Sequence, residues 1–179
     1  SEMCIRDSVE AGLRTHDVYS PWPEEFNRQA VDIVSEYYFA PTKQSQQNLL
    51  NEGKPGSKIY VTGNTGIDAL RTTVRDDYAH ADLTWATGSR LILITAHRRE
   101  NLGAPMHRMF RATRRVMEEH PDTKAIYPIH MNPEVRRAAH AELDGFDRLR
   151  IVEPLEVLDF HNFMDASYLI LTDSGGIQE

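Results

Sequence analysis

The chain has little cysteine and no long hydrophobic run. Its one cysteine, Cys4, cannot form a disulfide within the chain, which indicates a reducing compartment such as the cytoplasm. No apolar stretch approaches the roughly 20 residues that a membrane-spanning helix requires. Basic residues are also in the minority, since 20 lysines and arginines stand against 27 acidic residues for a formal net charge of −7. Neither a nucleic acid nor a membrane is therefore expected as a partner unless a local basic patch opposes the overall charge.

Metal-ligand spacing is missing from the sequence as well. No set of His, Asp and Glu residues is spaced as the ligands of a metal site usually are, so no metal is expected. What is present is an ordinary globular composition, with 40% hydrophobic and 26% charged residues. His107, His120 and His140 fall on expected helix or loop surfaces and are interpreted as solvated.

Apolar strand patterns alternate with helical patterns along the chain. Strands are predicted at 37–40, 58–61, 91–94, 125–127, 150–152 and 168–171, with helical segments between them. One of these helices, opened by Pro105, is expected to bury a face made of Leu102, Met106, Met109, Phe110, Val116 and Met117. Strands that alternate with helices predict parallel sheets joined by right-handed crossovers. Two such sheets are expected, one on each side of residues 71–89, where no clear period is present.

Three loops of the second half follow predicted strands directly. They carry His97, His130 and the turn Ser174-Gly175-Gly176. In open parallel sheets, ligands lie beyond the carboxyl ends of the strands. Glycines allow the backbone to approach a phosphate closely, and the guanidinium groups of Arg98 and Arg99 match its oxygens. A diphosphate site at these loops is one interpretation, and a simple Ser-Gly-Gly turn without a ligand is the other.

Neither end of the chain shows a complete strand or helix pattern. Residues 1–8 show neither strand alternation nor helical periodicity, and they are interpreted as a non-native or frayed leader ahead of Val9. At the other end, the apolar residues 169–171 run into a glycine pair that would normally open a helix, and the sequence stops there. The chain is therefore interpreted as an interior piece of a longer protein.

Six motifs make the sequence similar to a known family. They are VEAGLRT (9–15), SPWPEEFNRQ (20–29), TGNTGIDAL (62–70), TAHRREN (95–101), YPIHMNP (127–133) and LILTDSGGIQE (169–179). In this order and spacing they resemble the non-hydrolysing UDP-N-acetylglucosamine 2-epimerases of bacteria. The resemblance implies the glycosyltransferase B type of α/β fold, in which the nucleotide sugar binds between two Rossmann-like domains. On that basis residues 9–75 are part of the first domain, 76–89 connect the two, and 90–179 are part of the UDP-binding second domain.

The resemblance also implies a reaction. UDP-N-acetylglucosamine would be inverted reversibly at C2 to UDP-N-acetylmannosamine, for cell-surface polysaccharide biosynthesis, through elimination of UDP to 2-acetamidoglucal and its addition back. That chemistry needs a carboxylate base at C2, a second acid/base on the opposite face, and cationic and amide donors for the departing UDP. The family uses no cofactor, and a cytoplasmic homodimer is expected.

Matched motif by motif, the resemblance assigns roles to ten residues. The catalytic roles fall to Glu10, Glu24 and His97, the UDP contacts to Ser174, Gly175, Gly176, Phe160 and Arg99, and a second, allosteric substrate site to Arg98 and His130.

Several of these residues have a simple structural alternative. Glu10 could merely pair with Arg14 at a strand end. Glu24 and the glutamate after it could merely complement the dipole of a helix that begins there. Phe160 could be part of the core, and His130 could be a hydrogen-bonded loop histidine without a ligand.

The sequence also departs from the family. Ser8 stands where family members usually carry a histidine before VEAGLRT, and parts of both domains fall outside the 179 residues. A full-length protein with this sequence is therefore expected to be an epimerase, and this piece alone to be inactive. The alternatives are a hydrolysing epimerase or a glycosyltransferase of the same fold, and a non-catalytic protein that binds a nucleotide sugar.

Overall fold

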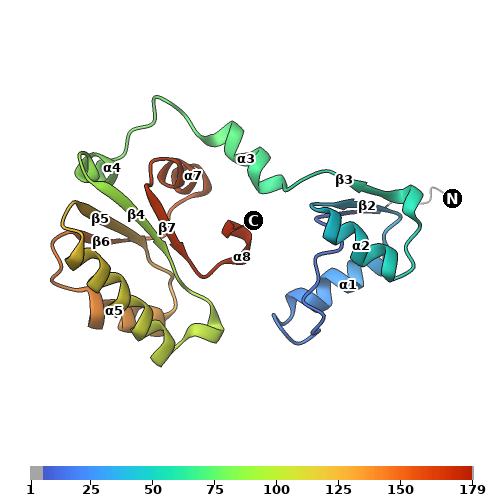
Figure 1. Cartoon of the computed structure of the whole chain (residues 1–179), viewed down its shortest axis with the longest axis horizontal. Helices are drawn as coiled ribbons and strands as arrows, with labels where there is room; N and C mark the ends of the chain where they lie inside the picture. Colours follow the sequence, from blue (N-terminus) through green and yellow to red (C-terminus); the bar gives the residue numbers. More distant parts are fainter. Residues whose placement is uncertain (1–5, 179) are drawn as a thin grey trace. The chain divides into compact units, whose positions relative to one another are not determined.

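The computed structural model describes residues 6–178 (Figure 1), and it divides into two compact units. The first unit ends at Ala69 and the second begins at Leu70, within helix α3 (Thr65–Thr73). Each unit is built on its own parallel sheet, which confirms the predicted α/β class with two parallel sheets. The domain boundaries of the wider fold stay a prediction.

The first unit contains a three-stranded sheet in the order β1-β2-β3. The strands are β1 (Asp7–Val9), β2 (Tyr37–Ala40) and β3 (Ile59–Val61), all parallel, and the helical segments between them are α1 (Glu24–Val34), α2 (Lys43–Asn51) and the 3-10 turn η1 (Gly56–Lys58). Helix α2 begins where the hydroxyl of Thr42 accepts a hydrogen bond from the backbone N–H of Ser45, a standard N-cap. The core of this unit is small and consists of Ala11, Tyr38, Ala40, Leu49 and Ile59.

Strand β1 was not predicted from the sequence. Asp7 and Ser8 fall in the segment that was interpreted as a leader, yet they pair in parallel with Tyr37 and Tyr38 of β2. The strand is only three residues long, and its buried position is the polar Ser8. The sequence therefore shows no alternation of apolar residues that would predict it. A buried hydrogen bond from the Ser8 hydroxyl to Asp32 compensates for that polarity. Residues 1–5 of the expected leader, with Cys4, lie outside the described residues.

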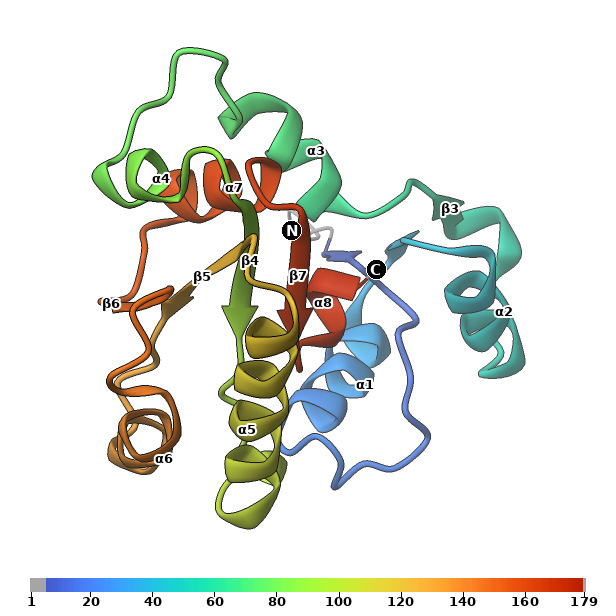
Figure 2. The same ribbon diagram turned by 60° about the vertical axis from the view of Figure 1, so that its left-hand side comes forward.

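The second unit contains a four-stranded sheet in the order β6-β5-β4-β7. All of its strands are parallel, and Figure 2 shows β4 and β7 running side by side in the same direction. The elements in chain order are α4 (Ala81–Ala86), β4 (Arg90–Thr95), η2 (Arg99–Asn101), α5 (Ala104–Glu119), β5 (Thr123–Pro128), α6 (Pro133–Leu143), β6 (Leu149–Val152), α7 (Val157–Asp165), β7 (Leu169–Thr172) and α8 (Gly175–Gln178). Helix α4 lies in the segment for which no period was predicted, and it is capped by the ring of His80, which accepts from the backbone N–H of Asp82.

Strand β4 separates the two halves of this unit's core. Its residues alternate between the faces of the sheet. Ile92 and Ile94 pack with α5 and α6, whereas Leu91 and Leu93 pack with Phe163 of α7 on the opposite face. Figure 1 shows α5 and α7 on opposite sides of the sheet. The second unit is therefore a three-layer α/β structure, and the carboxyl ends of its strands open onto one edge.

The buried stripe of α5 follows Met106, Phe110, Thr113 and Met117. Val116, which was predicted to belong to this face, is 44% exposed, so that prediction is wrong. The reason is angular: Val116 precedes Met117 by one residue, and one residue rotates by about 100° around a helix. The methionines do fill the core, as expected, since Met106 and Met117 are completely buried.

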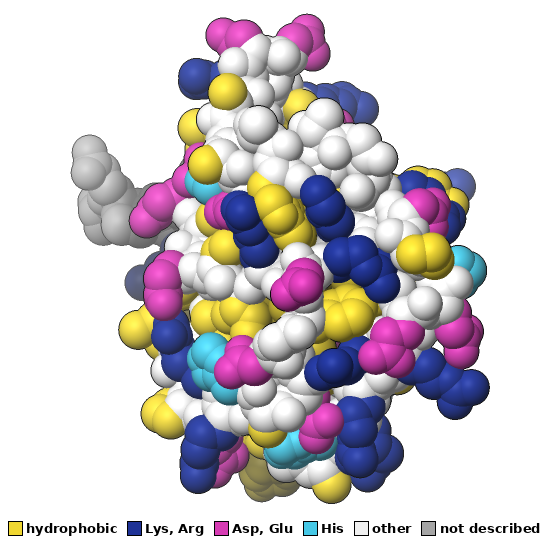
Figure 3. Space-filling view, turned by 90° about the vertical axis from the view of Figure 1, so that its left-hand side faces the viewer, with side chains coloured by type: hydrophobic (Ala, Val, Ile, Leu, Met, Phe, Trp, Pro, Cys, Tyr) yellow, Lys and Arg dark blue, Asp and Glu magenta, His cyan; other side chains and the backbone are white. Residues whose placement is uncertain are grey.

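Acidic and basic side chains lie next to one another on the face shown in Figure 3. On α5, Arg114 pairs with Glu118 at 3.2 Å and Arg115 with Glu119 at 3.1 Å. Exposed pairs of this kind contribute only about 0.3–0.5 kcal/mol each. A single fully buried side chain such as Phe110 contributes about 1.5–3 kcal/mol, so packing against the sheet dominates the stability of the helix.

Candidate functional site

A cavity of about 490 Å³ lies at the carboxyl ends of β4 and β5 in the second unit. The loop after β4 contributes His97, and the loop after β5 contributes His130. Phe160 of α7 and Ile177 of α8 also line it. The volume is within the range of about 300–1,000 Å³ that is usual for small-ligand sites.

The two histidines lie close together at this cavity. The ring centroids of His97 and His130 are 5.1 Å apart, and the side chain of His97 is 46% exposed. The Nδ1 atom of His130 accepts a hydrogen bond from the backbone N–H of Asn132, so its neutral ring carries the proton on Nε2. His130 therefore satisfies both interpretations of the sequence: it is a hydrogen-bonded loop histidine, and it also faces the cavity.

Phe160 likewise satisfies both of its interpretations. It is partly buried against the cluster that contains Leu93 and Phe163, and it lines the cavity as well. An aromatic side chain fixed by the core on one side presents a rigid apolar wall on the other.

Asp173 fixes the loop that carries His97. Its carboxylate accepts hydrogen bonds from the backbone N–H groups of His97 at 3.1 Å and Arg98 at 2.9 Å, and from the side-chain amide of Asn101 at 3.0 Å. Neighbouring strands make this contact available, because Thr95 at the end of β4 pairs with Thr172 at the end of β7. Asp173 was not predicted as a site residue from the sequence, although its place directly after β7 is the one signal that could have identified it.

A second contact holds the start of the same loop. The buried hydroxyl of Tyr127, on β5, donates a hydrogen bond to the backbone carbonyl of Ala96 at 2.6 Å. Burial, together with the negative charge of Asp173, raises the pKa of Tyr127, so its hydroxyl stays a donor. The loop is therefore anchored from β5 as well as from β7.

The predicted anion-binding residues are arranged around the end of β7. Arg98 lies beside Gly175, since a Cβ built at that glycine would meet its Nη2 atom at 3.5 Å. Arg98 also donates to the carboxylate of Glu100 at 3.1 Å. The backbone N–H of Ser174 bonds to the hydroxyl of Thr172, and α8 begins at Gly175. Arg99 is exposed on η2 and is not among the residues that line the cavity, so its predicted UDP contact stays a prediction.

The candidate carboxylates lie in the first unit. Glu10 directly follows β1, is exposed, and accepts a hydrogen bond from the hydroxyl of Thr65 at 2.7 Å. The alternative in which Glu10 pairs with Arg14 is wrong, because Arg14 donates to Asp32 and Glu52 instead. A hollow of about 220 Å³ lies beside Glu10, between the end of β1 and α1.

Glu24 and Glu25 differ sharply in their surroundings. Glu24 is exposed in the first turn of α1, whereas Glu25 is completely buried. One carboxylate oxygen of Glu25 accepts from Gln29 at 3.0 Å; the other has no hydrogen-bond partner among the described residues, and Arg28 lies 3.8 Å from it. The family motif assigns a catalytic role to Glu24 alone, and the difference in burial between the two glutamates is visible only in the structure.

The part of the chain that the structure describes contains neither a cluster of metal ligands nor a membrane-spanning helix. Within residues 6–178, no three His, Cys, Asp or Glu side chains are grouped as metal ligands. None of the helices in that range is both long and apolar enough to cross a membrane.

Two units, each built on a parallel sheet flanked by helices, define the general class of this protein as an α/β fold of the glycosyltransferase B type. Within that class the family is clear. The family model described as UDP-N-acetylglucosamine 2-epimerase matches residues 8–179, and the chain belongs to this family.

Individual relatives agree with the family model. The UDP-N-acetylglucosamine 2-epimerase of Bacillus subtilis is 56% identical over 171 residues, which are 96% of this chain and 45% of the relative. The S. aureus MnaA–UDP co-structure has a TM-score of 0.92 at 51% identity, covering 97% of this chain and 47% of that one. The enzyme from Neisseria meningitidis bound to UDP-GlcNAc has a TM-score of 0.87 at 40% identity, covering 97% and 49%. This chain thus spans about half the length of the relatives that it matches.

Proposed function

We propose that a full-length protein with this sequence is a non-hydrolysing UDP-N-acetylglucosamine 2-epimerase. It would interconvert UDP-N-acetylglucosamine and UDP-N-acetylmannosamine without a cofactor. The observation that carries the proposal is the loop of His97 and Arg98, which is held by Asp173, lines the cavity with His97 and brings Arg98 beside Gly175. The similarity to proteins whose structures contain UDP or UDP-GlcNAc supports the same ligand here.

UDP is assigned to the cavity of the second unit. Phe160 would pack near the uracil, because it offers a fixed aromatic wall. The diphosphate would lie near the turn of Ser174, Gly175 and Gly176, where glycines allow close approach of backbone amides. Arg99 would add positive charge, and His97 would donate to the diphosphate as it departs.

The reaction requires two groups that exchange a proton at C2. Glu10 and Glu24 are assigned these roles, and both side chains are exposed and so accessible to a ligand. A base removes the C2 proton, the C2–H electron pair forms the C1–C2 double bond, and UDP leaves with the C1–O pair. The glucal is then protonated at C2 from the opposite face, and UDP adds back at C1.

A second substrate molecule is assigned to Arg98 and His130 as an allosteric ligand. The 5.1 Å separation of the His97 and His130 rings supports this, because a molecule bound at one ring would lie near the other. A homodimer and a cytoplasmic location are part of the same proposal and rest on the resemblance and on the single cysteine.

Product analysis in deuterated buffer tests the proposed function. The full-length protein, incubated with UDP-N-acetylglucosamine in D₂O, is expected to form UDP-N-acetylmannosamine with deuterium at C2 and to leave both nucleotide sugars intact. Free UDP with free sugar would indicate a hydrolysing epimerase, and a new glycoside would indicate a transferase. Tight binding without any turnover would indicate a nucleotide-sugar-binding protein.

A further inference from the structure

Glu10 has a backbone conformation that its neighbours must enforce. Its φ is 57°, in the left-handed region that side chains other than glycine rarely adopt. Such residues persist only where the surrounding structure holds them, and they gather at functional sites. The contacts on either side of Glu10 therefore fix its backbone, and with it the direction in which the side chain leaves to meet the hydroxyl of Thr65 at 2.7 Å.

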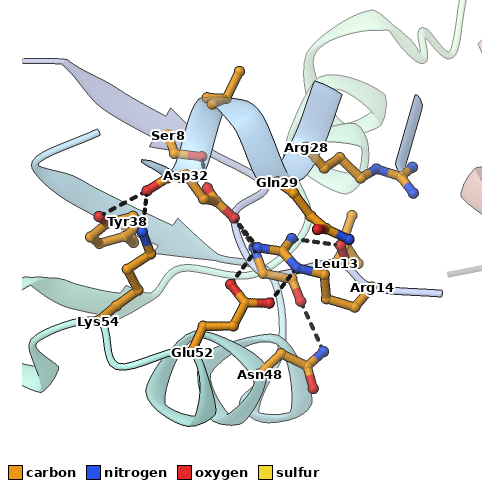
Figure 4. Close-up of polar contacts among 12 residues, drawn as sticks. Ser8, Leu13, Arg14, Arg28, Gln29, Asp32, Tyr38, Asn48, Glu52 and Lys54 are labelled. Carbon is orange, nitrogen blue, oxygen red and sulfur yellow. Dashed lines mark hydrogen bonds and ion pairs between the residues drawn. The ribbon is translucent and has the colours of Figure 1, made fainter. Parts of the chain in front are cut away.

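The carboxylate of Asp32, on α1, bonds to residues on both sides of Glu10, and Figure 4 shows it between Ser8 and Arg14. One oxygen accepts from the hydroxyl of Ser8 at 2.6 Å, two residues before Glu10. The other accepts from the backbone N–H of Gly12 at 3.3 Å, two residues after it. The side chain of Asp32 is only 2% exposed, so these bonds are shielded from water and cannot easily be exchanged for solvent.

Arg14 completes this arrangement and neutralises it. Its guanidinium donates to Asp32 at 2.6 Å and to Glu52 at 2.7 and 2.8 Å, and it is 1% exposed. Burial opposes the charge of Arg14, but the bonds to Glu52 and Asp32 outweigh this and raise its pKa above the usual value. A buried Asp32 with a permanent cationic partner is a fixed anchor for the loop.

The anchor is itself tied to the rest of the unit. The backbone carbonyl of Asp32 accepts from the ammonium of Lys54 at 2.6 Å and from the hydroxyl of Tyr38 at 3.1 Å. On the other side of the loop, Asn48 of α2 donates to the backbone carbonyl of Gly12 at 2.9 Å. The loop of Glu10 is thus held between α1 and α2, while the Glu10 side chain stays exposed.

We propose that Asp32, bonded to Ser8, Gly12 and Arg14, is a positioning residue that holds Glu10 in its strained conformation and so directs the Glu10 carboxylate. The inference rests on the proposed function, in which Glu10 acts at C2. The Asp32 side chain is only 2% exposed and its carboxylate oxygens are taken up by Ser8, Gly12 and Arg14, so it is assigned no contact with the reacting atoms. Its removal should therefore slow the chemical step without weakening the binding of the nucleotide sugar.

The test compares Asp32→Asn with Glu52→Gln in the full-length protein. Both changes remove a carboxylate from Arg14, but only the first disturbs the acceptors of Gly12 and Ser8. Asp32→Asn is expected to lower kcat by roughly tenfold to a hundredfold, the usual scale for a misplaced catalytic group, with KM within about twofold of the wild type. Glu52→Gln is expected to keep kcat within about twofold. Asp32→Glu restores the charge and should recover part of the lost kcat.

A purely structural role predicts a different pattern. Activity would then follow the folded fraction, so kcat per folded molecule, measured well below the thermal midpoint, would stay normal in Asp32→Asn. That result, or an equal loss of kcat in Glu52→Gln, would overturn the proposal. If Asp32→Asn does not fold, the same comparison is made with Ser8→Ala, which removes only one of the bonds to Asp32. This variant is expected to give a smaller loss of kcat. An unchanged kcat in Ser8→Ala would also overturn the proposal. A wild type with no epimerase activity would remove the proposed function and this inference together, whereas an active wild type with a normal Asp32→Asn removes the inference alone.

Discussion

The carboxylate of Asp173 accepts a hydrogen bond from the backbone nitrogen of Arg98 at 2.9 Å, joining the ends of two neighbouring strands. The same carboxylate also holds His97 and Asn101. Charged acceptors in such bonds contribute about 1.5–3 kcal/mol each. Asp173, 75 residues away in sequence from Arg98, is therefore the main anchor of the His97 loop on the β7 side.

Asp173→Ala is expected to weaken UDP binding by roughly tenfold or more in the full-length protein, because the His97 loop loses the hydrogen bonds that hold it. A tenfold loss of affinity corresponds to about 1.4 kcal/mol of binding free energy. Calorimetric titration of UDP measures this. Asp144→Ala is the matched control, since the exposed carboxylate of Asp144 pairs with His140 on α6 and lies away from the cavity lining. Equal UDP affinity in Asp173→Ala and the wild type would show that the loop keeps its shape without the carboxylate.

Glu10→Gln and Glu24→Gln should each lower turnover by roughly a hundredfold or more, the usual scale for removing an acid/base group. UDP affinity should change little, because the amide keeps the size of the carboxylate. Glu25→Gln is the control, since Glu25 is completely buried and is assigned no contact with substrate. If Glu25→Gln alone loses activity, the motif has been matched to the wrong glutamate of the pair.

His130→Ala tests the allosteric role. The full-length enzyme is expected to respond sigmoidally to UDP-N-acetylglucosamine, and the variant should flatten this curve more than it lowers the maximal rate. His107→Ala is a suitable control, because His107 bonds to Glu142 on α6 and lies away from the cavity lining. A hyperbolic curve in the wild type would remove the basis for a second substrate site.

Tyr127 should make stability depend on alkaline pH. Its pKa is raised in the folded protein by burial and then by Asp173, so folding favours the protonated phenol. This contribution is complete below about pH 10, the pKa of an unfolded tyrosine, and is lost as the pH rises further. The thermal midpoint of the wild type should fall more steeply above about pH 10 than that of Tyr127→Phe. Tyr19→Phe, at an exposed position, should behave as the wild type does, and parallel curves for all three would contradict this expectation.

The fold was predictable where the buried residues of an element form a regular apolar pattern in the sequence. Strand β4 has five consecutive buried positions, so its apolar run was visible in the sequence. Strand β1 has no such pattern, because it is three residues long and its buried residue is a serine. Val116 shows the limit within a helix, where one residue of offset decides between core and solvent.

The candidate site was predictable only through its motifs. His97, His130 and the glycine turn could be assigned to strand ends, and the structure brings both histidines to one cavity. Asp32 could not be identified, because it acts on residues 18 to 24 positions away and a sequence gives no sign of such pairings. Asp173 acts on residues 72 to 76 positions away, and only its place directly after β7 marks it in the sequence. The burial of Glu25 beside the exposed Glu24 is likewise decided by the direction of α1 and not by residue type.

Gly12 limits how the first unit can be re-engineered. Its φ is 81°, and a Cβ built there would overlap the backbone carbonyl oxygen of Ser45 on α2. The loop and the helix therefore fit only as a pair, and Gly12→Ala would force α2 away from the end of β1. A designer who wished to transplant the Glu10 loop into another parallel sheet would have to transfer α2 with it, in the same register. Without α2, the loop would lose the helix surface against which Gly12 packs.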